Sequence, residues 1–224
     1  THAAEHPDEQ KAVRSALGKD DVDLLREWGI AGPRAVLAHG VQLTAAQIKR
    51  AARLGTRFVH CPSANLKLSS GIAEVAKMRS AGVVMGLGAD GAPCNNRMDP
   101  WTEIRQAALL AKARAKDATA LPAVDALAMA TIDGARVLGL EDRTGSIEVG
   151  KRADLTVVRL DGLHAEPGDD VVARLVYACT AADVRHVLVD GRVVVEDGAL
   201  QTLDEERVRA QARRHAKKVL ARAF

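Results

Sequence analysis

The feature that most constrains this chain is the alternation of short apolar runs with segments of helical spacing over its first 140 residues. The apolar runs cover residues 35–39 (AVLAH), 57–61 (RFVHC) and 83–90 (VVMGLGAD). The helical segments that follow them cover 44–54, about 72–81 and about 100–116. Strands that alternate with helices predict βα units and a parallel sheet, so the predicted fold class is α/β.

The first 28 residues add a fourth unit of the same kind. Residues 7–28 have a mostly helical pattern and closely follow His2, which we therefore expect to end a strand. Four units with polar residues at their carboxyl ends predict half of a (β/α)8 barrel, a fold in which catalytic groups lie at the strand ends. A doubly wound sheet also alternates, but the chain contains neither the G-x-G-x-x-G motif nor the P-loop that mark its usual ligands.

The pattern changes after about residue 140. A further helix is predicted at 122–139, and a β-rich stretch follows it, in which Asp190-Gly191 between two β-branched runs predicts a hairpin. A short helix is predicted at about 169–178 and a longer one at about 202–222. We expect three parts: half of a barrel at 1–140, a portion of a small β-sandwich at 141–200 and a C-terminal helix at 201–224.

Composition and charge limit the classes of partner. The chain is 47% hydrophobic, which provides an aliphatic core, and its net charge of +3 is spread too evenly for a nucleic-acid-binding face. Its one basic run, at 207–218, follows two glutamates in a helical pattern and is explained by a solvated helix. No apolar run reaches the roughly 18 residues that a membrane span requires. Three cysteines without framework spacing favour a reducing compartment, so we expect a cytoplasmic protein.

Candidate metal-binding and catalytic side chains stand at the predicted strand ends. His2, His39, His60 and Asp90 each end a different strand, and Glu5 follows His2 by three residues. Imidazoles and a carboxylate that converge at one edge are typical of a catalytic divalent-metal site, and a further carboxylate can move a proton there. Each residue alone has a simpler interpretation as a buried histidine, a turn, a frayed terminus or a loop anchor. Their shared position at successive strand ends favours the metal site.

Several segments of the chain resemble motifs of the amidohydrolase superfamily. They are 2–5 (HAAE), 38–40 (AHG), 60–71 (HCPSANLKLSSG), 88–96 (GADGAPCNN), 150–155 (GKRADL) and 189–192 (VDGR). The closest resemblance is to its methylthioadenosine/S-adenosylhomocysteine deaminase and chlorohydrolase branch, with segment 90–96 most similar to 5′-deoxyadenosine deaminase-type members. The resemblance covers residues 1 to about 200, and the combination of motifs is what makes it specific.

The resemblance implies a role for each candidate residue. His2 and Asp90 would be ligands of one divalent metal, zinc or iron, while Glu5, His39 and Asp90 would be catalytic. His39 would hold the attacking water, whose pKa the metal lowers towards ~7, and Asp90 would accept its proton. Glu5 would protonate a ring nitrogen, and ammonia would leave. The implied partner is a small-molecule purine nucleoside, with no nucleic acid and no membrane, and a homo-oligomer is left open.

One motif of the superfamily is missing. Its members have an H-x-H at the end of the first barrel strand, which supplies two further metal ligands, and no H-x-H occurs in these 224 residues. The chain also begins without Met, so we expect it to be the C-terminal half of a longer protein. Two candidate ligands are fewer than the three of an ordinary catalytic zinc site, so we expect this polypeptide alone to bind metal weakly and not to turn over substrate.

Three functions stay open. The first is a deaminase of adenosine-type nucleosides such as 5′-deoxyadenosine, methylthioadenosine or S-adenosylhomocysteine. The second is another ring hydrolase of the superfamily, either a guanine or 8-oxoguanine deaminase or a triazine-type hydrolase. The third is a non-catalytic homologue, which would have no need for a water-activating set of side chains. Arg97, Trp101 and Arg105 follow the last predicted strand, and we expect them to serve surface helix packing rather than to line a pocket.

Overall fold

The computed structural model describes residues 1–223 and divides into two compact units. The first unit comprises residues 1–151 and 160–181, and the second comprises 152–159 and the chain from residue 182 onwards. The described residues of each unit form a four-stranded sheet, parallel in the first and antiparallel in the second. The predicted division into 1–140, 141–200 and 201–224 stays a prediction.

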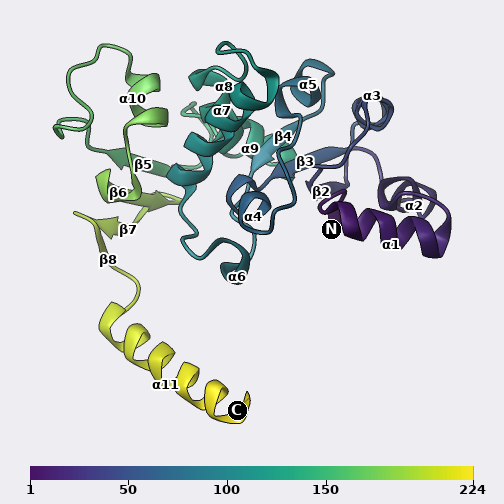
Figure 1. Cartoon of the computed structure of the whole chain (residues 1–224). Helices are drawn as coiled ribbons and strands as arrows, with labels where there is room; N and C mark the ends of the chain where they lie inside the picture. Colours follow the sequence, from purple (N-terminus) through teal and green to yellow (C-terminus); the bar gives the residue numbers. More distant parts are fainter. Residues whose placement is uncertain (224) are drawn as a thin grey trace. The chain divides into compact units, whose positions relative to one another are not determined.

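The parallel sheet of the first unit has its strands in chain order (Figure 1). They are β1 (His2–Ala3), β2 (Val36–His39), β3 (Arg57–His60) and β4 (Met85–Leu87). In the register, Ala3 lies opposite His39, and His60 lies opposite Leu87. The parallel pairing confirms the α/β prediction, including the strand at the start of the chain. Strand β4 is shorter than the predicted run at 83–90, and Asp90, three residues beyond its end, has a φ of +60°.

Capping signals explain where several helices of the first unit begin and end. The helices that follow the strands are α1 (Pro7–Leu17), α2 (Asp21–Glu27), α3 (Ala45–Leu54), α5 (Val75–Ser80) and α7 (Pro100–Ala115). Thr44 and Gln47 form a capping box at the start of α3, and Gly55 ends that helix in the left-handed conformation. Asp99 caps α7, with Pro100 in its first turn. These helices confirm the predictions at 7–28, 44–54 and 100–116.

Other parts of the helix prediction are wrong. The segment 122–139 forms two helices, α8 (Ala123–Ala130) and α9 (Ile132–Leu138), because Thr131 leaves the helical region with φ −125° and ψ −103°. Helix α5 begins at Val75 rather than near residue 72. Two short helices, α4 (Pro62–Lys67) and α6 (Ala92–Asn95), were not expected, since segments of four to six residues are too short to show a helical period.

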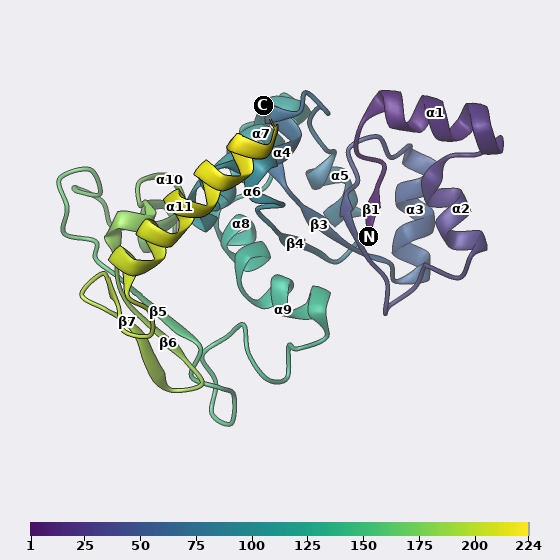
Figure 2. The ribbon, with the colours of Figure 1, turned by 90° about the horizontal axis from the view of Figure 1, so that it is seen from below.

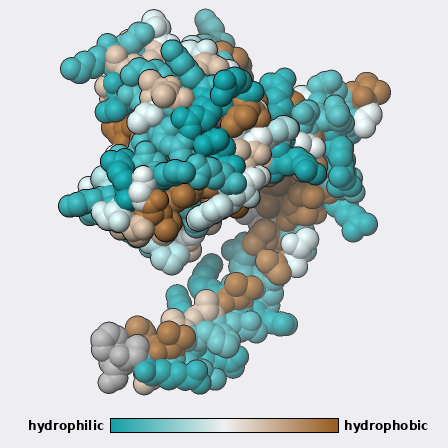
Figure 3. Space-filling view, turned by 90° about the vertical axis from the view of Figure 1, so that its right-hand side faces the viewer, coloured by the Kyte–Doolittle hydropathy of each residue, from teal (hydrophilic) through white to brown (hydrophobic). Residues whose placement is uncertain are grey.

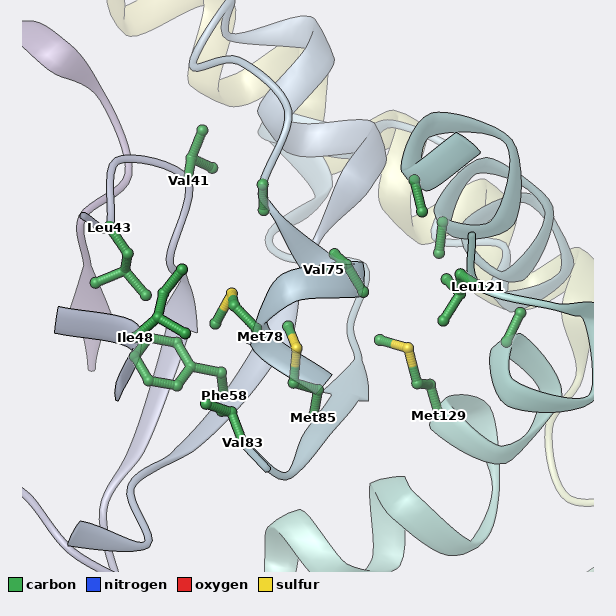
Figure 4. Packing of buried hydrophobic residues seen from close by; sticks show 14 of the residues in the cluster. Val41, Leu43, Ile48, Phe58, Val75, Met78, Val83, Met85, Leu121 and Met129 are labelled. Atoms are coloured by element: carbon green, nitrogen blue, oxygen red, sulfur yellow. The ribbon is translucent and has the colours of Figure 1, made fainter. Parts of the chain in front are cut away.

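The core of the first unit lies between the sheet and its helices. Its largest fully buried side chains include Leu37, Phe58, Met78, Met85 and Met129. In Figure 4 the three methionines, from α5, β4 and α8, occupy the space between strands and helices. Helices α8 and α9 pack on β4 (Figure 2), and α10 (Val171–Tyr177) packs on α7 and α8. Each such side chain contributes roughly 1.5–3 kcal/mol when buried, so this core holds the strand ends firmly in place.

The second unit contains the antiparallel sheet and the last helix. Its strands, in the order β5-β6-β7-β8, are β5 (Leu155–Val158), β6 (Val184–Val189), β7 (Arg192–Glu196) and β8 (Ala199–Leu200). Asp190 and Gly191 both have positive φ between β6 and β7, which confirms the predicted hairpin. Helix α11 (Glu205–Ala223) exposes its charged side chains together with apolar ones such as Val208 and Leu220 (Figure 3). No helix within residues 1–223 has both the length and the apolar character needed to cross a membrane.

Candidate active site

The carboxyl ends of the parallel strands bring three predicted site residues together. His2 comes from β1, His39 from β2 and Asp90 from the loop after β4, and one potential ligand atom of each lies within 4.8 Å of the other two. The carboxyl ends of parallel strands meet at one edge of a sheet, so residues far apart in the chain converge there. His2 is exposed, Asp90 is partly buried and His39 is fully buried. The group therefore spans the boundary between core and solvent.

The backbone is unusual at this edge. His39 has a φ of +77° and Asp90 a φ of +60°, in the left-handed region that residues other than glycine rarely adopt. Such conformations cost about 1–3 kcal/mol each and persist where the surrounding structure enforces them, often at functional sites. Two residues before Asp90, a Cβ atom on Gly88 would lie 2.6 Å from Cγ1 of Val59, so only glycine fits where β4 approaches β3.

The ring of His39 is held from both sides. Its Nδ1 lies 2.8 Å from Oδ1 of Asn65, and the ring stacks on His2 with centroids 5.5 Å apart and planes 18° from parallel. An amide oxygen at Nδ1 accepts a hydrogen bond in the tautomer that carries the proton on Nδ1, and in that tautomer Nε2 has a lone pair. Nε2 lies 3.4 Å from Oε2 of Glu5, yet it is buried and makes no aligned hydrogen bond within the described chain.

These donors suit a divalent metal. Two imidazoles and a carboxylate are ligands that zinc prefers, and a metal-binding imidazole usually donates its other N–H to an oxygen, a place that Asn65 Oδ1 takes at His39. Nε2 of His39 is buried without a hydrogen-bond partner in residues 1–223, so in the tautomer protonated at Nδ1 it has a lone pair for coordination. The sequence predicted His2 and Asp90 as the ligands, and the structure adds His39 to the same group.

Glu5 lies in the loop between β1 and α1, beside this group. Its side chain is 16% exposed, and its Oε2 approaches Nε2 of His39 as described. Glu5 therefore lies beside the converging group, as its spacing from His2 indicates.

His60 ends β3 as predicted but is not among the three residues that converge. Burial, with His39 nearby, lowers the pKa of His60 to about 4, so its ring is neutral at pH 7. Its Nδ1 is buried without a hydrogen-bond partner in the part of the chain described. Next to it, burial raises the pKa of the Cys61 thiol to about 12, with the carboxylate of Asp90 adding to the rise. This strand end therefore carries no charge at neutral pH.

Sequence reasoning missed three polar residues around the site: Asn65, Asn95 and Glu103. Asn65 and Asn95 stand inside the motif-like segments 60–71 and 88–96, so their presence was noted without a role. Glu103 lies on α7 outside those segments, and only its burial in the structure, at 1% exposure, draws attention to it.

Arg97 precedes α7, and Trp101 and Arg105 lie on it; their assignment to surface helix packing stays a prediction. They line a hollow of about 420 Å³ together with Tyr177 of α10. Arg105 Nε donates a hydrogen bond to the backbone oxygen of Tyr177 at 3.1 Å. The hollow lies beside α7, and its lining includes none of the converging residues.

The fold and the site together define a class: α/β proteins in which histidines and an aspartate that could bind a metal lie at the ends of parallel strands. Comparison with known families identifies the family within this class. Residues 1–194 match the model of the amidohydrolase family, and the chain belongs to that family.

Named relatives agree with this assignment. The chain is 44% identical over 219 residues to a 5-methylthioadenosine/S-adenosylhomocysteine deaminase of Desulforudis audaxviator, which covers 98% of the chain and 51% of that protein. It is 41% identical over 222 residues to a 5′-deoxyadenosine deaminase of Methanosarcina acetivorans, covering 99% of the chain and 51% of the relative. The chain thus spans about half the length of the curated relatives it matches.

Solved structures share the fold. A zinc-bound adenosine deaminase from Xanthomonas campestris superposes with a TM-score of 0.95 at 38% identity, covering 98% of this chain and 50% of that one. A zinc complex of the atrazine chlorohydrolase from Arthrobacter aurescens superposes with a TM-score of 0.86 at 29% identity, over 94% of this chain and 47% of the other.

Proposed function

We propose that this chain is the C-terminal half of a hydrolytic deaminase that removes ammonia from adenosine-type nucleosides with the help of one divalent metal. The convergence of His2, His39 and Asp90, with Glu5 beside His39, is the observation that carries the proposal. In this view the first unit supplies strands five to eight of a (β/α)8 barrel, and the antiparallel sheet is part of a β-sandwich. The match to only half of each deaminase relative supports that view.

The metal would be held by His2 and Asp90, with His39 close enough to join them. Zinc is the proposed ion and iron the alternative, because imidazole and carboxylate ligands suit both. When bound, the ion supplies Lewis acidity, which lowers the pKa of a water molecule and makes it nucleophilic near neutral pH.

The side chains of this chain would then move the protons. His39 orients the attacking water, and the carboxylate of Asp90 accepts its proton as a C–O bond forms at the ring carbon that carries the amino group. Glu5 gives a proton to the adjacent ring nitrogen, so that no unpaired negative charge accumulates on the ring. The C–N bond breaks as the amine takes the proton held by Asp90 and leaves as ammonia, while the new hydroxyl returns a proton to Glu5, so that a carbonyl remains. Positioned acid and base groups of this kind contribute about 10²–10⁴-fold in rate.

A different ring hydrolase is the alternative. The structures of a triazine hydrolase and of the guanine deaminase of E. coli also share the fold, at 29% and 27% identity. The higher identity of the adenosine-type deaminases, at 41–44% over nearly the whole chain, favours the nucleoside substrate. A cytoplasmic location and a homo-oligomer stay predictions.

The test is ammonia release from 5′-deoxyadenosine, methylthioadenosine, S-adenosylhomocysteine and guanine by the chain extended upstream to the length of its relatives, with metal content measured on the same sample. We expect release from the adenosines with about one metal per chain. Glu5→Gln should keep the metal and lose at least ~10²-fold in rate, because it cannot deliver a proton as a carboxylic acid does. Glu9→Gln, at an exposed position of α1, is the matched control. Metal-loaded protein that releases no ammonia from any of the four would contradict the proposal.

A further inference from the structure

Asn95, at the end of α6, uses every hydrogen-bonding atom of its side chain. Its Nδ2 donates to the backbone oxygen of Ala89 and to Oε1 of Glu103, both at 2.8 Å. Its Oδ1 accepts from the backbone N–H groups of Arg97 at 3.2 Å and Met98 at 3.0 Å. An amide side chain offers two donor hydrogens and two lone pairs, so all four are taken. Two donors face its oxygen and two acceptors face its nitrogen, which fixes the orientation of the amide.

Glu103, in the first turn of α7, is the acceptor on the other side. It is 1% exposed, and Oε2 accepts from the backbone N–H of Ser63 at 3.1 Å while Oε1 accepts from Asn95. Within residues 1–223 it forms no ion pair with a lysine, arginine or histidine. A buried carboxylate is costly unless its oxygens are satisfied, so the two hydrogen bonds to Ser63 and Asn95 determine where it can lie.

These bonds join two strand ends through one helix. Ala89 directly precedes Asp90, whose left-handed backbone aims its carboxylate at the converging group. Ser63 is the second residue of α4, the helix that follows β3. Glu103 and Asn95 therefore connect the end of β4, the end of β3 and the start of α7. Asn95 also holds the turn before α7, in which Asn96 and Met98 have positive φ.

We propose that Asn95 and Glu103 act together as positioning residues that fix the backbone carrying Asp90 relative to the other strand ends. Both residues are buried and neither is in the converging group, so we expect them to act through the position of Asp90 and not as metal ligands. Their effect on zinc affinity follows from the geometry of Asp90, and only their effect on turnover rests on the proposed function. Groups that orient a metal ligand in this way typically contribute 10–100-fold to affinity or activity.

The donor and acceptor pattern makes the pair sensitive to conservative changes. Asn95→Asp replaces the donor by a second acceptor, which then faces Ala89 O and Glu103. Glu103→Gln replaces one accepting oxygen by an NH₂ group, while both of its partners are donors. In the double variant the new NH₂ of residue 103 can donate to the new carboxylate of residue 95, which restores their mutual bond but leaves Ala89 O against an acceptor.

The experiment compares these three variants in the upstream-extended chain, stripped of metal. Zinc affinity is measured by competition with a chromophoric chelator, and kcat and KM for 5′-deoxyadenosine are measured on the reloaded protein. Gln106→Met is the matched control: it removes the hydrogen bond from Ser63 Oγ to Gln106 Oε1 on the same helix without touching Asn95. If Glu103→Gln does not fold, Glu103→Asp replaces it, since it keeps the charge and withdraws it by one methylene.

We expect each single variant to lose 10–100-fold in zinc affinity, with the loss in turnover falling on kcat, while the control stays within about twofold of the native protein. The double variant should lose less than the product of the single losses without reaching the native value. Single variants that bind zinc as tightly as the control, or a double variant with fully multiplicative losses, would overturn the inference. If zinc affinity falls as expected but no nucleoside is deaminated, the positioning role stands and the proposed reaction fails.

Discussion

Among single residues, His39 and His60 show how one amino-acid type takes two different states at neighbouring strand ends. Nδ1 of His39 lies against Oδ1 of Asn65, while its Nε2 has no hydrogen-bond partner among the described residues. His60 is fully enclosed, and its lowered pKa keeps it neutral. The sequence alone placed both histidines in one candidate set, because each stands at or next to the end of an apolar run. Which of them reaches the site depends on packing that the run does not encode.

The lowered pKa of His60 predicts a pH dependence of stability. The unfolded state takes up a proton near pH 6.5 and the folded state only near pH 4, so the unfolded state binds more protons between these values. Stability should therefore fall as the pH drops from about 6.5 to about 4, by up to about 3 kcal/mol from this group.

Urea unfolding of the metal-free chain at several pH values measures this fall. His60→Asn should flatten the profile over that range, whereas His215→Asn, at an exposed position of α11, should leave it unchanged. An equal slope in both variants would contradict the assignment to His60.

For helices, the start of α3 provides the clearest test of local signals. Both reciprocal bonds of the capping box are present between Thr44 and Gln47. Thr44→Ala removes the side-chain acceptor for the Gln47 N–H and should lower the free energy of unfolding by about 0.5–2 kcal/mol. Thr202→Ala, at an exposed position outside the helices, should change it by less than about 0.5 kcal/mol. Denaturant unfolding measures the free energy of unfolding of both variants. Equal values for Thr44→Ala and Thr202→Ala would show that the capping box contributes nothing to stability.

The elements that could be predicted are those with a local physical signal. Alternating runs and caps predicted the parallel strands and α1, α2, α3 and α7, and a two-residue turn predicted the β6–β7 hairpin. Helices α4 and α6 could not be predicted, because they are too short for periodicity; they pack on each other, and α4 also packs on α7. The Asn95–Glu103 pair could not be predicted either, because a hydrogen bond between two segments leaves no periodic pattern in the sequence.

For the whole molecule, the important fact is that the chain spans about half of its relatives. The described residues offer three candidate ligands at the strand ends, and the family resemblance implies two more in an upstream H-x-H. We expect the chain by itself to bind zinc at least roughly tenfold more weakly than the upstream-extended protein, a difference of about 1.4 kcal/mol or more.

Titration of both proteins with zinc against the same chelator measures this difference. Replacing both histidines of the upstream H-x-H by alanine should reduce the extended protein to the affinity of the chain alone. Equal affinity of the chain and the unaltered extended protein would show that His2, His39 and Asp90 form a sufficient site without further ligands.

The convergence of His2, His39 and Asp90 also affects the order of folding. His2 and Asp90 come from the first and last strands of a four-stranded parallel sheet, and closing the chain between them loses entropy before any contact stabilises it. Non-local pairings of this kind form slowly, so the group is among the last features to assemble when the protein refolds. Metal uptake is then a kinetic marker of completed folding, since a partly folded chain has the ligands but not their proximity.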